Sequence, residues 1–110
     1  MINYDVIPKL IMDKSIPLKE LGIMEFAWNV DDIKEIIATF DAKKIPILGG
    51  DVYKMVDDKV CYTYDSWFIN KSSENDFYRI SHEKAISYIS NYEERNEGQF
   101  FYTIIFWIHM

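Results

Sequence analysis

Two runs of apolar, β-branched and aromatic residues surround a short polar break near the middle of the chain. The runs cover residues 45–56 and 60–70, and the break is Asp57-Asp58-Lys59. Extended apolar runs on either side of a short polar turn are typical of an antiparallel β-hairpin. The pattern therefore predicts a hairpin over residues 45–70, and we expect the rest of the fold to be built around it.

The first strand of this hairpin contains the pair Gly49-Gly50. Glycine inside a strand has no side chain to pack and costs backbone entropy, so a pair indicates a bulge or a point where another group comes close to the backbone. That group is either a neighbouring element of the fold or a partner. In both cases we expect Gly50→Val to destabilise the fold or to block partner binding.

A helix is predicted over residues 31–44, where apolar residues recur at intervals of three and four. Asn29 or Asp31 can cap its N-terminus by accepting from the free N–H groups of the first turn. Ile45-Pro46 ends it, because the residue before a proline avoids the helical region. The predicted buried stripe consists of Ile33, Ile36, Ile37 and Phe40.

A second helix is predicted from an N-terminal cap at Ser81 to about Glu94. It follows a polar loop at residues 71–76 and a stretch at residues 77–80 that has the composition of a short strand. Its periodicity places four residues toward the core. These residues are Ala85, Ile86, Ile89 and Tyr92.

The remaining segments are shorter or less regular. Residues 5–14 predict a short helix with Pro8 in its first turn, and residues 15–22 predict a loop. Residues 23–28 alternate between apolar and other residues, which predicts a strand with Met24, Phe26 and Trp28 on one face and Glu25 and Ala27 on a wet face. Residues 99–109 predict a last strand that is apolar on both faces.

This order of elements predicts an α+β fold. We expect a two-layer sandwich in which two helices pack on one face of a four-stranded, mainly antiparallel sheet, with a short N-terminal helix added. The 110 residues suffice for one domain, residues 1–110. A ferredoxin-like arrangement would leave the doubly apolar last strand at an edge. Either the N-terminal helix covers that strand, or the protein forms a homodimer there, or the strand order differs.

The charge and composition narrow the classes of partner. The net charge of −6 argues against nonspecific DNA or RNA binding, which depends on Lys and Arg at the phosphates, and favours a basic partner protein. Cys61 is the only cysteine, so it cannot form an internal disulfide, and we expect a reducing cytoplasm. The N-terminus lacks the pattern of a signal peptide. The apolar run at residues 100–108 is about half the roughly 20 residues of a membrane span.

No pattern of catalytic or metal-binding residues emerges from the chain. His82 and His109 are far apart and Cys61 is near neither, so no zinc pattern exists. A nucleophilic site built from Cys61 or Ser66 with His82 and Asp65 has no supporting sequence context. We expect Cys61 to be a buried structural cysteine and His82, after the predicted cap, to be exposed. No cofactor and no enzymatic activity are predicted.

The second strand of the hairpin carries two alternating sets of side chains. If the set that begins at Val60 faces the helices, Asp65 and Trp67 lie on the opposite face, where Trp67 is partly exposed beside a carboxylate. Trp and Tyr among polar atoms are usual anchors of protein interfaces. The alternative is that Trp67 lies in the core, because tryptophan is highly buried on average. The first set consists of Val60, Tyr62, Tyr64 and Phe68.

These features make the hairpin the candidate binding region. We expect Trp67→Ala, or charge reversal at Asp65, to weaken binding and to leave the fold intact. The candidate partner-binding residues are Gly49, Gly50, Asp51, Tyr53, Asp65 and Trp67.

Several of these segments resemble the immunity protein 40 family of bacterial polymorphic-toxin systems, over about residues 20–95. The resemblance lies in residues 45–53, which contain Leu-Gly-Gly-Asp-Val-Tyr, in Tyr64-Asp65-Ser66-Trp67, in Ala27-Trp28 with the capped helix after it, and in Ser81 with the helix at residues 85–92. It implies a small cytoplasmic protein that binds and neutralises a cognate toxin domain, and it brings no catalytic residues.

Two other classes of function stay open at this point. The first is a small enzyme or ligand-binding domain with a cleft near Gly49, Asp51, Asp65 and Ser66, which a deep pocket with a perturbed carboxylate would favour. The second is a structural homodimer formed through the apolar C-terminal strand.

Overall fold

The predicted hairpin is confirmed and forms the centre of the fold. The structure is a computed structural model that describes residues 3–108. Strand β3 (Ile47–Val56) pairs antiparallel with β4 (Lys59–Phe68). The turn consists of Asp57 and Asp58, whose φ angles are 50° and 64°. Two residues with positive φ are typical of the turn whose twist matches that of the flanking strands.

The last part of the chain pairs with the other edge of β3. It forms two short antiparallel strands, β5 (Gln99–Tyr102) and β6 (Ile105–Phe106), where one strand over residues 99–109 was predicted. Beyond β5, Trp28 and Tyr102 exchange backbone hydrogen bonds of 2.9 and 2.7 Å. Strand β5 therefore lies between β3 and Trp28, so the ferredoxin-like order is wrong. His109 lies outside the described residues.

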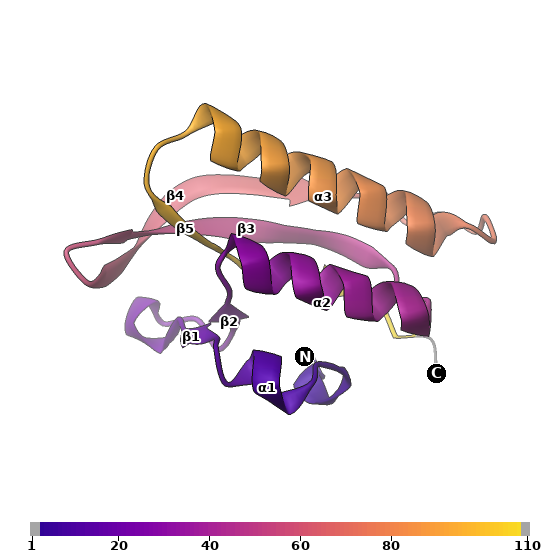
Figure 1. The fold of residues 1–110 in the computed structure, drawn as a ribbon, viewed down its shortest axis with the longest axis horizontal. Helices are drawn as coiled ribbons and strands as arrows, with labels where there is room; N and C mark the ends of the chain where they lie inside the picture. The colour runs from indigo at the N-terminus through magenta and orange to yellow at the C-terminus, as the bar shows by residue number, and fades with distance from the viewer. Residues whose placement is uncertain (1–2, 109–110) are drawn as a thin grey trace.

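Two helices cover one face of the sheet, which confirms the predicted α+β class (Figure 1). Helix α2 (Val30–Lys43) lies within one residue of the prediction at both ends, and the Asn29 side chain caps it by accepting from Asp32 N at 2.9 Å. The predicted stripe of three isoleucines and Phe40 is buried. The local signals of this segment were sufficient because cap and stripe lie within one stretch of sequence.

Helix α3 (Phe77–Arg95) begins five residues earlier than predicted, since the residue before its first turn is Asp76 and not Ser81. The predicted strand at residues 77–80 and the predicted cap at Ser81 are wrong, because Phe77 and Ser81 extend the buried face of the helix at a spacing of four. The Ser81 hydroxyl donates to Tyr78 O at 2.8 Å and accepts from Ile47 N at 3.0 Å. Ser81 therefore joins α3 to the first residue of β3.

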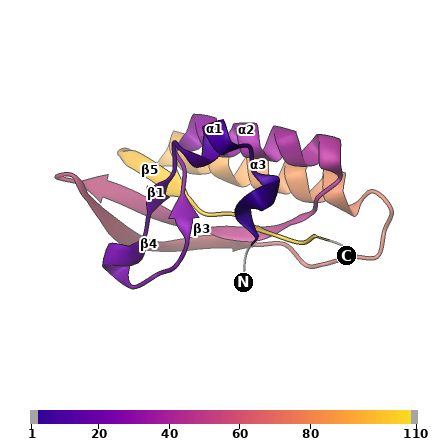
Figure 2. The ribbon, with the colours of Figure 1, turned by 90° about the horizontal axis from the view of Figure 1, so that it is seen from below.

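The segment before α2 crosses to the other face of the sheet, near the hairpin turn (Figure 2). It contains β1 (Ile16–Pro17), the turn η2 (Lys19–Leu21) and β2 (Phe26–Ala27), which pairs with β1. Ala27 was predicted on a wet face but is fully buried, because it packs with Tyr53 and Phe101 on this side of the sheet. Met24, predicted to face inward, is 89% exposed.

This crossing segment also covers the second apolar face of β5. The homodimer was one explanation for that face, and the single chain covers it without a second copy. The predicted helix at residues 5–14 is present as two short pieces, η1 (Tyr4–Val6) and α1 (Lys9–Met12), on either side of Pro8. No helix among residues 3–108 is long and apolar enough to cross a membrane.

Candidate functional site

Trp67 faces the helices and lies in the core. Its side chain is 9% exposed, and its ring stacks on that of Tyr88 in α3, with 5.1 Å between the centroids. The expectation that Trp67 is partly exposed is therefore wrong, and the alternative of a core tryptophan is what the structure has. We call the side of the sheet that meets α2 and α3 the closed face; Gly50, Val52 and Trp67 point into it.

The glycine pair is explained by contacts within the chain. A Cβ atom at Gly50 would overlap the carbonyl oxygen of Thr103 and the ring of Trp67. A Cβ atom at Gly49, where φ is +150°, would overlap the carbonyl oxygen of Trp67. The group that comes close to this backbone is thus a neighbouring element of the fold, which was one of the two predicted explanations.

The opposite side of the sheet is only partly covered. The crossing segment packs over the half that contains Tyr53, Met55 and Val60. Beyond it, Tyr64 is 90% and Phe68 is 79% exposed. We call this uncovered part, together with Glu25 just before β2, the open face. It consists of Glu25, Asp51, Tyr62, Tyr64, Ser66, Phe68 and Ile105.

A bulge in β4 lies at the edge of the open face. Asp51 pairs with Ser66 and Tyr53 pairs with Tyr62, so that Val52 lies opposite three residues of β4, residues 63–65. Because the bulge adds two residues to β4, the even-numbered residues of β4 face the same side of the sheet before and after it. Bulges bend a strand and change the direction of its side chains, and they are frequent next to functional sites.

The bulge directs Tyr64 into solvent. Tyr64 has a φ of 65°, which is uncommon for a residue other than glycine, asparagine or aspartate. The Thr63 hydroxyl stabilises the bulge, since it donates to Val52 O at 2.7 Å and accepts from Asp65 N at 3.1 Å. The Tyr64 ring stacks on Tyr62 with 5.5 Å between the centroids. A strained backbone that exposes an aromatic ring is a reason to consider this position functional.

A cavity of about 240 Å³ lies at the bulge. Its volume is below the range of roughly 300–1,000 Å³ that is usual for sites of small molecules. Two aspartates line it, and no Lys, Arg or His residue does. The residues that line it are Asp51, Val52, Tyr53, Tyr62, Tyr64, Asp65 and Ser66.

The carboxylates of the open face are poorly solvated. Burial raises the pKa of Asp51. Burial also raises the pKa of Glu25, and the charge of Asp51 raises it further. Burial first, and then both carboxylates, raise the pKa of Tyr53 to about 12. Glu25 Oε1 is buried and has no hydrogen-bond partner among the described residues. The fold therefore holds two acidic groups near each other without a cation of its own.

The six predicted binding residues do not form one surface. Gly49, Gly50, Tyr53 and Trp67 are buried. Asp51 and Asp65 both line the cavity, but the Asp65 carboxylate is directed to α3, where it accepts a hydrogen bond of 2.7 Å from the hydroxyl of Tyr92.

The exposed aromatic residues of the open face were missed because the prediction placed them toward the helices. Alternation alone distinguishes the two faces of a strand without identifying the buried one. Glu25 was missed as well, because β2 was expected to present it to solvent. The residues in question are Glu25, Tyr62, Tyr64 and Phe68.

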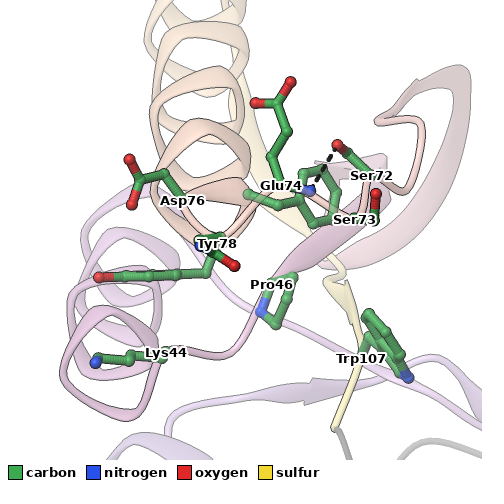
Figure 3. Close-up of a pocket in the computed structure, with 10 residues that line it drawn as sticks. Lys44, Pro46, Ser72, Ser73, Glu74, Asp76, Tyr78 and Trp107 are labelled. Carbon is green, nitrogen blue, oxygen red and sulfur yellow. Dashed lines mark hydrogen bonds between the residues drawn. The ribbon is translucent and has the colours of Figure 1, made fainter.

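A larger cavity, of about 610 Å³, lies elsewhere, between the start of α3, the end of α2 and Trp107 (Figure 3). Lys44, Glu74 and Asp76 give its walls charges of both signs, and Trp107 closes one side. No predicted site residue lines it. The open face is therefore the stronger candidate.

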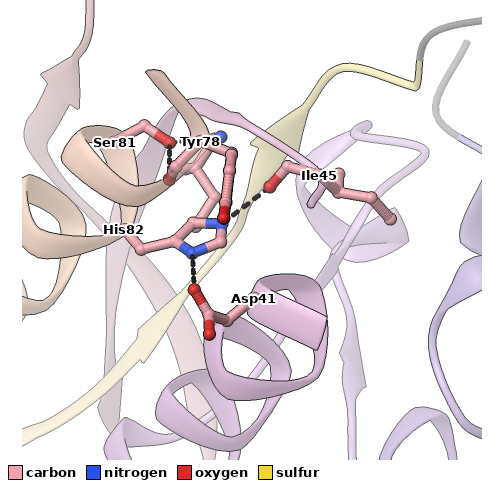
Figure 4. A network of polar contacts seen from close by, with 6 residues as sticks. Asp41, Ile45, Tyr78, Ser81 and His82 are labelled. Carbon is pink, nitrogen blue, oxygen red and sulfur yellow. Dashed lines mark hydrogen bonds and ion pairs between the residues drawn. The ribbon is translucent and has the colours of Figure 1, made fainter. Parts of the chain in front are cut away.

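His82 joins the two helices to the start of the sheet. It is buried, although it was predicted to be exposed, because α3 begins before Ser81. Nε2–H donates to Ile45 O at 2.7 Å, and Nδ1 lies 3.4 Å from Asp41 Oδ1 (Figure 4). These contacts give His82 a structural role.

Cys61 was predicted to be buried but is half-exposed on β4. Residues 3–108 contain no cluster of three His, Cys, Asp or Glu side chains that could hold a metal ion.

Comparison with known proteins gives one match. The model of the family described as Immunity protein 40 matches residues 17–106, which extend from the second residue of β1 to the last residue of β6. No curated protein and no solved structure matches the chain.

Proposed function

The chain belongs to the immunity protein 40 family, and from this membership we propose that it binds a cognate toxin domain and neutralises it as a stoichiometric inhibitor. The inhibitor covers the active site of the toxin or locks its conformation, and it performs no reaction itself. It acts in the cytoplasm, where a toxin delivered by a neighbouring bacterium would reach its target.

The single observation that supports this proposal is the open face. Tyr64 and Phe68, both in β4, expose most of their surface to solvent. Exposed aromatic residues beside polar groups are the usual anchors of protein interfaces. Asp51 and Asp65 border the same region, and the net charge of −6 favours a basic partner.

The predicted binding residues divide into two roles in this proposal. Asp51 and Asp65 contact the toxin. The buried residues Gly49, Gly50, Tyr53 and Trp67 hold β3 and β4 in the geometry that presents the open face. Loss of a buried residue would then weaken binding through loss of the fold.

A small enzyme or ligand-binding domain would use the same cavity, and the raised pKa of Asp51 is the observation in its favour. The cavity is small, however, and its walls contain no histidine, cysteine or lysine to act with the carboxylates. A small molecule that copurifies with the protein, or turnover that depends on Asp51, would favour this second function.

The test is co-expression with the toxin domain encoded by the neighbouring gene. We expect growth to be restored and the two proteins to copurify as a complex with one copy of each, measured by light scattering after size exclusion. The same mass measurement distinguishes this complex from one that contains a homodimer of the immunity protein. Toxicity that persists despite full expression of a folded immunity protein would contradict the proposal.

A further inference from the structure

We propose that the cavity at the β4 bulge receives an arginine side chain of the toxin domain, between the ring of Tyr64 and the carboxylate of Asp51. This inference rests on the proposed function and specifies the chemistry of its contact. Apolar residues of the toxin that surround the arginine pack on Phe68 and Ile105.

The charged residues around the cavity favour binding of a cation. Asp51 and Asp65 line the cavity and no basic side chain does, and Glu25 adds a carboxylate close enough to Asp51 to interact with its charge. The Asp65 carboxylate itself is bonded to Tyr92 of α3, so Asp51 and Glu25 are the acidic groups left for a partner. The ion pairs of Lys and Arg within the part of the chain that the structure describes join Lys9 to Asp13 and Lys14 to Asp32, and neither involves the open face. The open face therefore has unbalanced negative charge, and a partner must supply the positive charge.

The burial of these carboxylates distinguishes the cavity from an ordinary acidic surface. Exposed carboxylates are well solvated and cost the fold little, whereas burial raises the pKa of both Asp51 and Glu25. Glu25 Oε1 has no donor within the described residues. A buried polar atom without a partner costs free energy, which a donor from the toxin would recover.

The aromatic residues select arginine over lysine. Tyr53, Tyr62 and Tyr64 form a row, with 5.9 Å and 5.5 Å between successive ring centroids. A planar guanidinium stacks on an aromatic ring and can bond to two carboxylates at once, whereas an ammonium is a compact and strongly hydrated charge. The small volume of the cavity also suits one side chain better than a separate ligand.

Phe68 and Ile105 give the cavity an apolar border. They pair on either side of Gly49, which has no side chain, so that their exposed side chains are adjacent across the sheet. A toxin segment with an arginine and one or two apolar residues would complement this arrangement, since interfaces combine a central anchor with a surrounding region that excludes water.

The test measures binding of the toxin domain to Asp51→Asn and to Tyr64→Ala by calorimetry, at low and at high salt. We expect each variant to weaken binding roughly tenfold or more. The affinity of the native protein should fall as salt rises, and that of Asp51→Asn should fall less, because one ion pair is gone. Glu83→Gln, an exposed carboxylate on α3, and Leu10→Ala, an exposed residue on α1, are the matched controls and should bind normally.

The outcomes separate this inference from the proposed function. Tight binding by the native protein together with unchanged affinity of both variants overturns the arginine site and leaves the proposed function standing. A native protein that does not bind the toxin domain overturns both. Reduced affinity of both variants with normal controls supports the inference. The partner residue is then the toxin arginine whose replacement by lysine weakens binding to the native protein as much as Asp51→Asn does. The same replacement should not weaken binding to the Asp51→Asn variant any further.

Discussion

The two faces of the central hairpin use the same strands for different purposes. On the closed face, Gly50, Val52 and Trp67 are buried, and the Trp67 ring leaves no room for a Cβ atom at Gly50. On the open face, Tyr64 and Phe68 are exposed, and Asp51 is partly buried without a cation. Successive residues of one strand thus belong to different environments.

Under the proposed function, this difference separates residues that stabilise the fold from residues that contact the toxin. A protein selected for stability alone would cover Phe68 and would pair Asp51 and Glu25 with bases. The open face does neither, and the strained backbone at Tyr64 adds to its cost. We therefore expect substitutions on the closed face to reduce stability, and substitutions on the open face to reduce binding with little effect on stability.

The largest effect is expected for Trp67→Ala on the closed face. Removal of this ring leaves a cavity under Tyr88, and we expect a loss of about 3–5 kcal/mol in the free energy of unfolding, measured by urea denaturation. This replaces the expectation that the substitution leaves the fold intact. A variant with native stability and reduced toxin binding would show that Trp67 contacts the partner directly.

Gly50→Val should come next, with a loss of about 3 kcal/mol, because its side chain would meet the backbone carbonyl of Thr103, which cannot turn aside. Gly22→Ala is the control. Its φ is +77° and a Cβ there meets nothing, so strain alone should cost about 1 kcal/mol. Equal losses in urea denaturation would contradict the crowding at Gly50.

His82→Ala should cost about 1–3 kcal/mol, because Ile45 O loses its buried donor. The neighbouring exposed residue gives the comparison: Glu83→Ala should change the free energy of unfolding by less than about 0.5 kcal/mol. Equal values for the two variants would mean that the contact between α3 and the end of α2 adds nothing to stability.

Phe68→Ala, on the open face, should change the free energy of unfolding by less than about 0.5 kcal/mol, since the ring is already exposed. The same variant should bind the toxin domain roughly tenfold more weakly. A stability loss as large as that of Trp67→Ala would show that the two faces are not distinct.

The smallest effect is expected from the pH dependence of Asp51→Asn. Since folding raises the pKa of Asp51, this carboxyl group stabilises the fold fully only below its unfolded pKa of about 4, and the contribution is lost as pH rises through the folded pKa. Asp51→Asn should therefore be more stable than the native protein at pH 7, and the difference should shrink toward about pH 4. Denaturation of both proteins across this range measures it.

Glu25→Gln should give a difference of the same sign, because burial and Asp51 both raise the pKa of Glu25. A native protein that is more stable than both variants at pH 7 would contradict the unbalanced charge of the open face.

Much of the closed face could be predicted because its signals are local. The cap Asn29 and the isoleucine stripe specify α2 within one stretch, and the glycine pair correctly indicated a close approach. The prediction of the second helix was less accurate. Its first turn contains residues with no strong local preference, and the position of Ser81 is determined by a hydrogen bond to Ile47, far away in the sequence.

The open face could not be predicted because it depends on contacts between distant segments. Alternation separates Tyr62 and Phe68 from Trp67, but only the packing of Trp67 on Gly50 and Tyr88 decides which set is buried. Strands β1 and β2 have two residues each, too few for a periodicity, and so the cover over Tyr53 and the position of Glu25 were not foreseen. Of the site itself, the sequence indicated Asp51 and Asp65.

The most direct test of the central claim is an NMR map of the complex, with isotope-labelled immunity protein and unlabelled toxin domain. The account predicts that the largest changes in amide chemical shift fall at residues 49–51, 62–68 and 105, and that the outward side of α3 changes little. Changes concentrated on α2 and α3, with the hairpin unaffected, would contradict it.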